Sequence, residues 1–250
     1  MLGDKLTGEI LTDWRTAPIS EKLRAALGFI VQLTNVPERI GPHDVATLRH
    51  LGVTERAIID ATYICVGFNI INRIADAMDF QVPQTKVFVR GAWFMRRFGY
   101  RLISGSFVGK NGGRLHSPER VTSIDPYERM MHRLQYSVFS GPGTLDALLR
   151  QAIGEGDDID EDALRQYVNA VAQRDYKLLD RCISVLRSNG YSDDQIFEAT
   201  VCAALAAGVE RLRLVLDAIV LYPHTIDSDQ YVVSTGPDDS AQPVPMLTSR

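Results

Sequence analysis

The chain contains 250 residues, of which 45% are hydrophobic and 23% are charged, and its formal net charge is −4 at pH 7. This composition is ordinary for a soluble globular protein, and the length allows one large domain or two packed ones. The negative charge argues against nucleic acid as a partner. No apolar run reaches the roughly 18 residues of a membrane-spanning helix, so we expect no membrane span.

The cysteines and the N-terminal residues indicate a compartment. Three cysteines lie far apart in the sequence, at Cys65, Cys182 and Cys202. An odd number of distant cysteines is typical of buried thiols in a reducing environment. The first residues also lack the apolar stretch of a secretory signal peptide. We therefore expect a cytoplasmic protein.

Helix-start and helix-stop signals recur along the first 103 residues. Ser and Thr are frequent N-cap residues, Pro is frequent in the first helical turn, and Gly often ends a helix in the left-handed conformation. After a loosely ordered lead-in over residues 1–18, we therefore predict a first helical domain over residues 19–103. We expect one helix from after Ser20 to near Asn35, a second from Pro42 to near Gly52 and a third from after Thr54 to near Met78. A last helix is expected over residues 84–104.

The rest of the chain is predicted to form a second helical domain. Residues 104–126 are rich in glycine and are expected to be a linker or loop. The tail over residues 223–250 is polar and proline-rich, which is typical of disorder. Because alternating strand patterns are scarce, the predicted fold class is all-α. The second domain covers residues 127–222, with helices over 127–137, 145–153, 161–173, 180–187 and 192–221.

One segment of the sequence occurs twice. The residues from Leu48 to Thr62 return as Leu186 to Thr200, which is an offset of 138 residues. Leu, Arg, Gly, Ile, Ala and Thr recur at the same places, and the similarity extends to Arg73 and Arg211. A duplicated helical segment predicts two related halves that share one core.

Several short motifs stand out within residues 27–80. They are Leu33-Thr34 before Pro37, Asp44-Val45, the Gly52–Ala61 segment and above all Phe68-Asn69-Ile70-Ile71-Asn72-Arg73-Ile74-Ala75-Asp76. Through these motifs, residues 27–80 resemble the alkylhydroperoxidase D-like, or carboxymuconolactone decarboxylase, superfamily, and more narrowly its two-repeat peroxidase-related members. Residues 176–218 look like a degenerate second copy. The resemblance implies an all-α fold of two related helical repeats packed as a domain pair, and it implies assembly as a homo-oligomer.

The redox motif of that family is missing. Redox members carry Cys-x-x-Cys about a dozen residues after a Glu, and a His four residues beyond the second Cys. There a thiolate attacks peroxide and the second Cys resolves the product as a disulfide. Two-cysteine peroxidase chemistry is therefore disfavoured. The corresponding positions here are Gly67, Ile70 and Ile74 in the first copy, and Leu205, Gly208 and Leu212 in the second.

A polar stripe is the main candidate site. Its members share one face of the helix predicted to follow Thr54, because they are spaced three or four residues apart. In one interpretation they cap neighbouring helices or pair across a subunit seam. In the other they form a pocket for a small carboxylate or carbonyl compound, with Arg73 as the anion clamp and the amides orienting it. The stripe comprises Thr62, Cys65, Asn69, Asn72 and Asp76, with Arg73 at its edge.

Two further candidates could add chemistry to the stripe. His43 stands at the start of a short helix, where a neutral imidazole suits a general base, although a surface N-cap residue is the commoner interpretation at that place. Cys65 could be a lone reactive thiol, or an inert thiol among apolar neighbours. No two histidines stand four residues apart, and no cysteine stands at metal-ligand spacing from a histidine. We therefore expect no metal and no cofactor.

Three functions remain open from the sequence. The first is a cofactor-free acid–base enzyme on a small molecule, with His43 and Asp76 as catalytic groups and Asn69, Asn72 and Arg73 as substrate ligands. The second is a non-catalytic oligomeric scaffold or binding subunit. The third is a one-cysteine peroxidase that uses Cys65. The first predicts a pocket at Arg73, the second predicts a stripe filled by protein side chains, and the third predicts a reactive thiol.

Overall fold

The computed structural model describes residues 4–80 and 126–221, and most of these residues are helical. No strand occurs within these two ranges, so the predicted all-α class is confirmed for them. The helix predicted over 84–104, residues 104–125 of the linker and the tail over 223–250 lie outside the described residues.

Residues 4–80 form α1 (Asp4–Asp13), α2 (Glu21–Asn35), the 3₁₀ turn η1 (Pro37–Arg39), α3 (Pro42–His50) and α4 (Glu55–Ala77). The side chains of Ser20 and Thr54 accept hydrogen bonds from the backbone N–H groups of Leu23 and Ala57, so both predicted N-caps are confirmed. The expectation of a loosely ordered lead-in is corrected, because most of its residues form α1.

Residues 126–221 form α7 (Pro126–Gln135), the π-helix η2 (Tyr136–Ser140), α8 (Ala147–Glu155), α9 (Asp162–Gln173), α10 (Tyr176–Ser188) and α11 (Asp193–Val220). The helix predicted from residue 145 begins two residues later. There the Asp146 carboxylate accepts hydrogen bonds from the N–H groups of Leu148 and Leu149. A carboxylate satisfies two free donors of the first helical turn at once, which places the helix start after Asp146.

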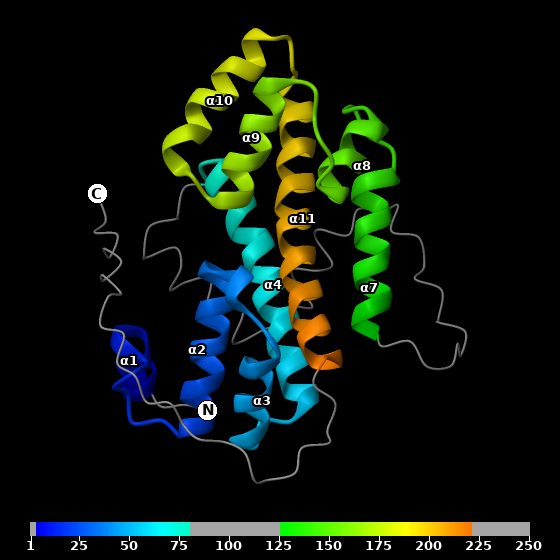
Figure 1. Ribbon diagram of the computed structural model, residues 1–250. Coiled ribbons are helices and arrows are strands. Elements are labelled where there is room, and N and C mark those ends of the chain that lie inside the picture. Colours follow the sequence, from blue (N-terminus) through cyan, green and yellow to red (C-terminus); the bar gives the residue numbers. More distant parts are fainter. Residues whose placement is uncertain (1–3, 81–125, 222–250) are drawn as a thin grey trace, which may run out of the picture.

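The two long helices α4 and α11 form the centre of the molecule, where they pack together and run in opposite directions (Figure 1). The short helices α2 and α3 lie beside α4, and α9 and α10 lie at the other end, beside the beginning of α11. A Cβ at Gly208 would lie 2.7 Å from Cγ1 of Ile70. The missing side chain of Gly208 therefore allows α4 and α11 to approach closely.

The buried core crosses the boundary between the two predicted domains. Val215 and Ala218, near the end of α11, pack into the cluster that contains Leu33 of α2. Ala77, at the end of α4, packs into the cluster that contains Leu164 of α9. Each half of the chain therefore contributes the end of its long helix to the core of the other half.

Local contacts recur at the offset of 138 residues. Gly52 and Gly190 both have a positive φ, at 78° and 91°, just after α3 and α10. This is the left-handed helix end expected at Gly52. Thr62 and Thr200 are both fully buried, and each hydroxyl donates to the carbonyl four residues earlier, at 2.8 and 2.7 Å. The two segments thus share backbone conformation as well as residue type.

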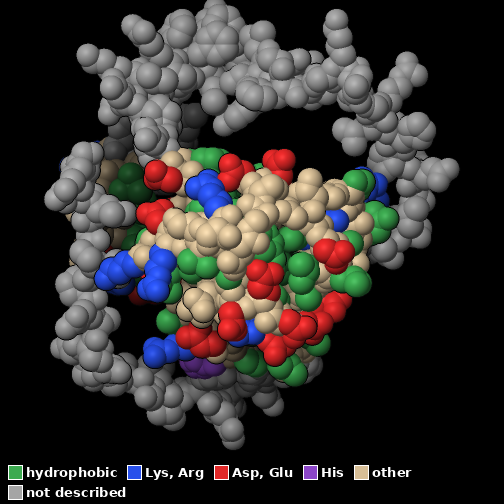
Figure 2. Space-filling model, turned by 90° about the horizontal axis from the view of Figure 1, so that it is seen from above, with side chains coloured by type: hydrophobic (Ala, Val, Ile, Leu, Met, Phe, Trp, Pro, Cys, Tyr) green, Lys and Arg blue, Asp and Glu red, His purple; other side chains and the backbone are tan. Residues whose placement is uncertain are grey.

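Two surface properties bear on the predicted partners. The end of the molecule at α9 and α10 carries acidic, basic and hydrophobic side chains interspersed (Figure 2). Among the described residues, α4 is the one helix long and apolar enough to cross a membrane by length and composition. A core helix of a soluble protein passes the same test, and α4 packs against α2 and α11. The absence of a membrane span therefore stays a prediction.

Candidate functional site

The structure buries most of the predicted polar stripe between α4, α2, α9 and α11. Cys65, Asn69 and Arg73 expose only 5%, 4% and 2% of their surface. Asp76 is half-buried near the end of α4, whereas Asn72 is exposed to solvent. Asn72 is therefore separated from the buried members of the stripe by its exposure.

Cys65 and Asn69 are bound to α2 through Thr34. The Asn69 amide nitrogen donates to the Thr34 hydroxyl at 3.3 Å and to the carbonyl and Sγ of Cys65 at 3.0 and 3.3 Å. The Cys65 thiol also lies 3.4 Å from the Thr34 hydroxyl. The Cys65 thiol is thus held in place by hydrogen-bonding groups of its own chain. The geometry fits a structural cysteine.

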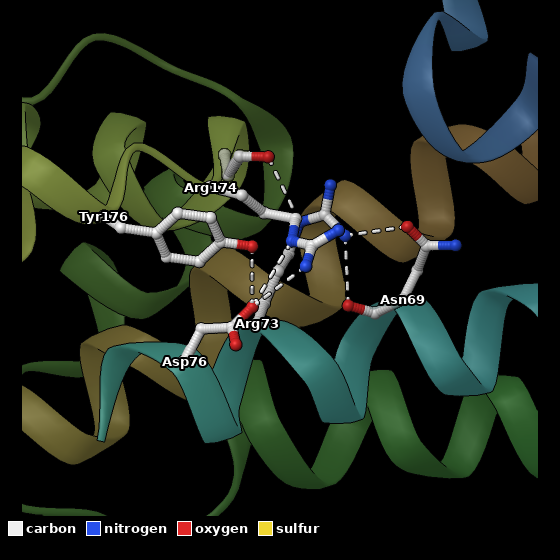
Figure 3. A network of polar contacts seen from close by, with 6 residues as sticks. Asn69, Arg73, Asp76, Arg174 and Tyr176 are labelled. Carbon is white, nitrogen blue, oxygen red and sulfur yellow. Dashed lines mark hydrogen bonds and ion pairs between the residues drawn. The ribbon is translucent and has the colours of Figure 1, made fainter. Parts of the chain in front are cut away.

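Arg73 connects α4 to α9. Its Nη1 donates to the carbonyl and side-chain oxygens of Asn69 at 3.0 and 2.8 Å, and its Nε donates to the carbonyl of Ala172 at 3.1 Å (Figure 3). Burial, followed by the positive charges of Arg211 and Arg174, lowers the pKa of Arg73 to about 10. The guanidinium therefore serves as a donor to neutral oxygens of its own chain.

Arg211 makes the corresponding connection in the opposite direction. Its Nη1 donates to the carbonyl of Ala207 at 2.8 Å, and its Nη2 donates to the carbonyl of Thr34 on α2 at 3.2 Å. Thr34 and Ala172, which accept from the two arginines, are themselves 138 residues apart. Burial also lowers the pKa of Arg211, and its buried Nε has no hydrogen-bond partner among the described residues.

Asp76 is held by two residues that follow α9. One carboxylate oxygen, Oδ2, accepts from Nε and Nη2 of Arg174 at 3.3 and 3.2 Å and from the Tyr176 hydroxyl at 3.1 Å (Figure 3). Burial raises the pKa of Tyr176, although Arg174 acts against this. The carboxylate thus joins the end of α4 to the turn between α9 and α10, where Arg174 has a positive φ of 59°.

The predicted catalytic residues are not brought together. His43 is exposed at the start of α3, and none of the hydrogen bonds of Asn69, Arg73 and Asp76 goes to it. Cys65 and Asp76 are eleven residues apart on one straight helix, which separates them by about 16 Å along its axis. A general base, a thiol and a carboxylate placed in this way cannot act on the same substrate atom.

Two surface depressions of the described residues lie away from the polar stripe. One of about 390 Å³ lies beside α1 and is lined in part by Glu9 and Asp13. Another of about 310 Å³ lies between α8 and α9 and is lined in part by Asp158 and Arg165. No residue of the polar stripe lines either of them. Within the described ranges there is also no group of three His, Cys, Asp or Glu side chains placed to hold a metal ion.

A second buried polar cluster was not predicted from the sequence. Arg150 exposes 4% of its surface and donates to the carbonyls of Leu145, Val138 and Gly141 at 3.1, 2.9 and 2.6 Å. These carbonyls belong to η2 and the loop before α8, whose backbone leaves them outside regular helical hydrogen bonds. Arg150 is buried and bound to backbone in the same way as Arg73.

Glu198 completes this cluster from α11. It accepts from the backbone N–H groups of Thr144 and Leu145, both at 2.8 Å, and from the Thr144 hydroxyl at 3.1 Å. Burial alone would raise the pKa of Glu198, but these hydrogen bonds outweigh it and lower the pKa. All these partners lie within the protein, so the cluster serves to hold the loop before α8 against α11.

The partners of the stripe were only partly visible in the sequence. Arg211 could be found because it corresponds to Arg73 in the duplicated segment. The carbonyl of Ala172 carries no side-chain signal, and neither do Arg174 and Tyr176, which follow a helix end.

Comparison with known proteins gave no match: no family model matches the sequence, and no curated protein and no solved structure is significantly similar to it.

Proposed function

We propose that this chain is a non-catalytic helical subunit of the alkylhydroperoxidase D-like type, which kept the two-repeat scaffold and assembles with further copies of itself. The observation that carries the proposal is the use of the polar stripe. Arg73 reaches the carbonyl of Ala172 on α9, and Arg211 reaches the carbonyl of Thr34 on α2. Arg73, which an enzyme would use as its anion clamp, and its counterpart Arg211 thus connect the two halves of the scaffold to each other.

The recurrence of contacts supports a duplicated scaffold. The helix-ending glycines, the buried threonines and the two arginines all correspond at one offset, and so do the carbonyls that the arginines bind. Reciprocal contacts of this kind are expected when two related units pack about a local two-fold axis. The proposal therefore includes the repeat and domain pairing implied by the resemblance.

The acid–base alternative has less support. Asn69 uses its amide nitrogen on Thr34 and Cys65 and its amide oxygen on Arg73. Arg73 and Asp76 are likewise occupied by groups of the chain, and a substrate would have to displace these partners. Breaking hydrogen bonds of a buried charged group costs about 2 kcal/mol or more each.

The peroxidase alternative also has little support. Cys65 exposes 5% of its surface and contacts Thr34 and Asn69, so its sulfur is largely shielded from solvent. The other cysteines, Cys182 and Cys202, are buried as well. Burial raises the pKa of Cys202 to about 12, and burial likewise raises the pKa of Cys182, so both stay thiols at neutral pH.

Two measurements on the full chain test the proposal. We expect analytical ultracentrifugation to give the mass of two or more chains at micromolar concentration, and a chain that stays monomeric at every accessible concentration would overturn it. We also expect Cys65 to be unreactive toward peroxide and maleimide in the native protein, with labelling after denaturation as the control. Rapid oxidation of Cys65 in the folded protein would instead support the peroxidase.

A further inference from the structure

The side of α4 that faces away from α11 and α2 is apolar and exposed. Ile64, Phe68 and Ile71 expose 63%, 62% and 60% of their surface. They are spaced four and three residues apart, so they form a continuous ridge on one side of the helix. Exposing large side chains in contiguous positions is unfavourable in water and is typical of an interaction surface.

Gly67 lies on the same side of α4 and has no role within the described residues. A glycine inside a helix costs about 1 kcal/mol relative to alanine. At Gly208 on α11 this cost has a structural reason, because a Cβ would meet Ile70 at 2.7 Å. A Cβ at Gly67 would meet nothing within 4 Å. The notch at Gly67 therefore leaves room for a side chain that approaches from outside.

The ridge is complementary to itself. The four positions 64, 67, 68 and 71 are spaced symmetrically about the midpoint between Gly67 and Phe68, with Ile at both outer positions and the notch beside the large ring at the centre. If a second α4 packs antiparallel about a two-fold axis at this midpoint, each Phe68 faces the notch at Gly67 of the other copy. The same operation places each Ile64 against Ile71 of the other copy. A two-fold interface requires a self-complementary patch of this kind.

We infer that two copies of this chain associate through α4, packed antiparallel about a two-fold axis between Gly67 and Phe68. The inference rests on the proposed function, since it names the surface through which the scaffold assembles. Ile64, Phe68 and Ile71 would bury roughly 100 Å² each. This supplies the apolar centre of an interface whose usual size is about 800 Å² per partner, and neighbouring surface supplies the rim.

Engineered disulfides in the full chain test the geometry. In the double variant Ile64→Cys/Ile71→Cys the two cysteines of one chain lie about 10 Å apart along the helix axis, too far for a bond within the chain. Across the inferred axis, residue 64 of one copy meets residue 71 of the other. We expect the double variant to form a covalent dimer on oxidation. The single variant Ile64→Cys should not, because its two copies of residue 64 lie on opposite sides of the axis.

The outcomes separate this inference from the proposed function. Cross-linking of the single variant would indicate parallel helices, and no cross-linking of either variant in an oligomeric protein would place the interface elsewhere. Both results overturn the inference and leave the scaffold function standing. A monomeric wild-type chain overturns both. Wild type, with its buried cysteines Cys65, Cys182 and Cys202, is the oxidation control.

A charge on the ridge gives an independent readout. We expect Phe68→Asp to raise the dimer dissociation constant at least about tenfold, because a carboxylate would be buried in the interface. Leu148→Asp is the matched control, since Leu148 is 74% exposed on α8 and should associate as wild type does. Equal dissociation constants for both variants overturn the inference. So does flotation with anionic vesicles that depends on Phe68 in a monomeric chain, which would identify a lipid surface as the occupant.

Discussion

Arg73 and Arg211 occupy corresponding places on α4 and α11, yet their surroundings differ. Arg73 receives two acceptors from Asn69, the backbone carbonyl and the side-chain oxygen. Ala207 stands at the place that corresponds to Asn69, so Arg211 keeps only the backbone acceptor there, and its Nε is left without a partner. The side-chain oxygen of Asn69 therefore adds a second acceptor for Arg73 beside the backbone carbonyl of the same residue.

The hydroxyl partners of the two buried threonines differ in the same way. In the second half the hydroxyls of Tyr167 and Thr200 are 2.5 Å apart. The residue that corresponds to Tyr167 is Phe29, which has no hydroxyl, and Thr62 is bonded to the carbonyl of Ile58. The two halves therefore differ in individual polar atoms of the core, although each half makes a connection to the other. This is expected when such atoms serve packing.

The largest expected effect is the loss of stability on replacing Arg73, compared with the loss on replacing Arg211. We expect Arg73→Ala to lower the free energy of unfolding by about 4 kcal/mol, because three buried acceptor contacts and the packed side chain are lost. Arg211→Ala should cost about 2 kcal/mol, since it makes two hydrogen bonds and carries an unpartnered Nε. Urea denaturation of both variants measures this, and equal losses would mean that Asn69 adds nothing to the first connection.

The second prediction compares the two helical glycines at concentrations where the chain is monomeric. Gly208→Ala should destabilise the fold by about 2 kcal/mol, because its Cβ overlaps Ile70. Gly67→Ala should stabilise the monomer by up to about 1 kcal/mol, because no atom lies within 4 Å of its Cβ. Thermal unfolding of both variants is the measurement. A loss at Gly67 similar to that at Gly208 would require a contact within the chain.

The third prediction compares Glu198 with Asp60, its counterpart on α4. Glu198→Gln should cost about 1.5 kcal/mol at pH 7, since the carboxylate accepts several hydrogen bonds. Asp60→Asn should cost only about 0.4 kcal/mol, because Asp60 is partly exposed and pairs with the more exposed Arg56 four residues earlier on the same helix. The folded-state pKa of Glu198 is lowered, so its contribution is present above its unfolded pKa and is lost as the pH falls. The two curves for wild type and Glu198→Gln should therefore converge in acid.

The smallest effect concerns the hydroxyl pair of the second half. Tyr167→Phe makes this position resemble Phe29 and removes one partner of Thr200, whose hydroxyl still donates to the carbonyl of Ile196. We expect a loss of about 1 kcal/mol in urea denaturation. An unchanged free energy of unfolding would mean that the second half, like the first half with Phe29, needs no hydroxyl at this position. A loss above 3 kcal/mol would show that the hydroxyl pair is essential to the second half.

Local sequence signals predicted the ends of the helices well wherever a capping residue sets the position of the end. Thr54 and Ser20 cap their helices, and Gly52 ends α3, because each signal acts through backbone groups a few residues away. The π-helix η2 and the start of α8 were not predicted in place. Their backbone is held by Arg150 and Glu198, which come from elsewhere in the fold.

The candidate site was predicted as a set of residues but not as a chemistry. Periodicity placed Cys65, Asn69 and Asp76 on one face of a helix, and the structure agrees with that face. Periodicity carries no information about which groups lie opposite. Only the tertiary structure places Thr34, Ala172 and Arg174 there, and these groups turn a possible pocket into a set of internal connections.

The helical class, many helix starts and the offset at which contacts recur could be read from the sequence, because they depend on short-range hydrogen bonding and on the period of the helix. The tertiary structure decided that the polar stripe of α4 is filled and that its opposite, apolar side is exposed. Both depend on which helices pack against α4. The physical reason is that burial and pairing are properties of two surfaces, and the sequence of one helix describes only one of them.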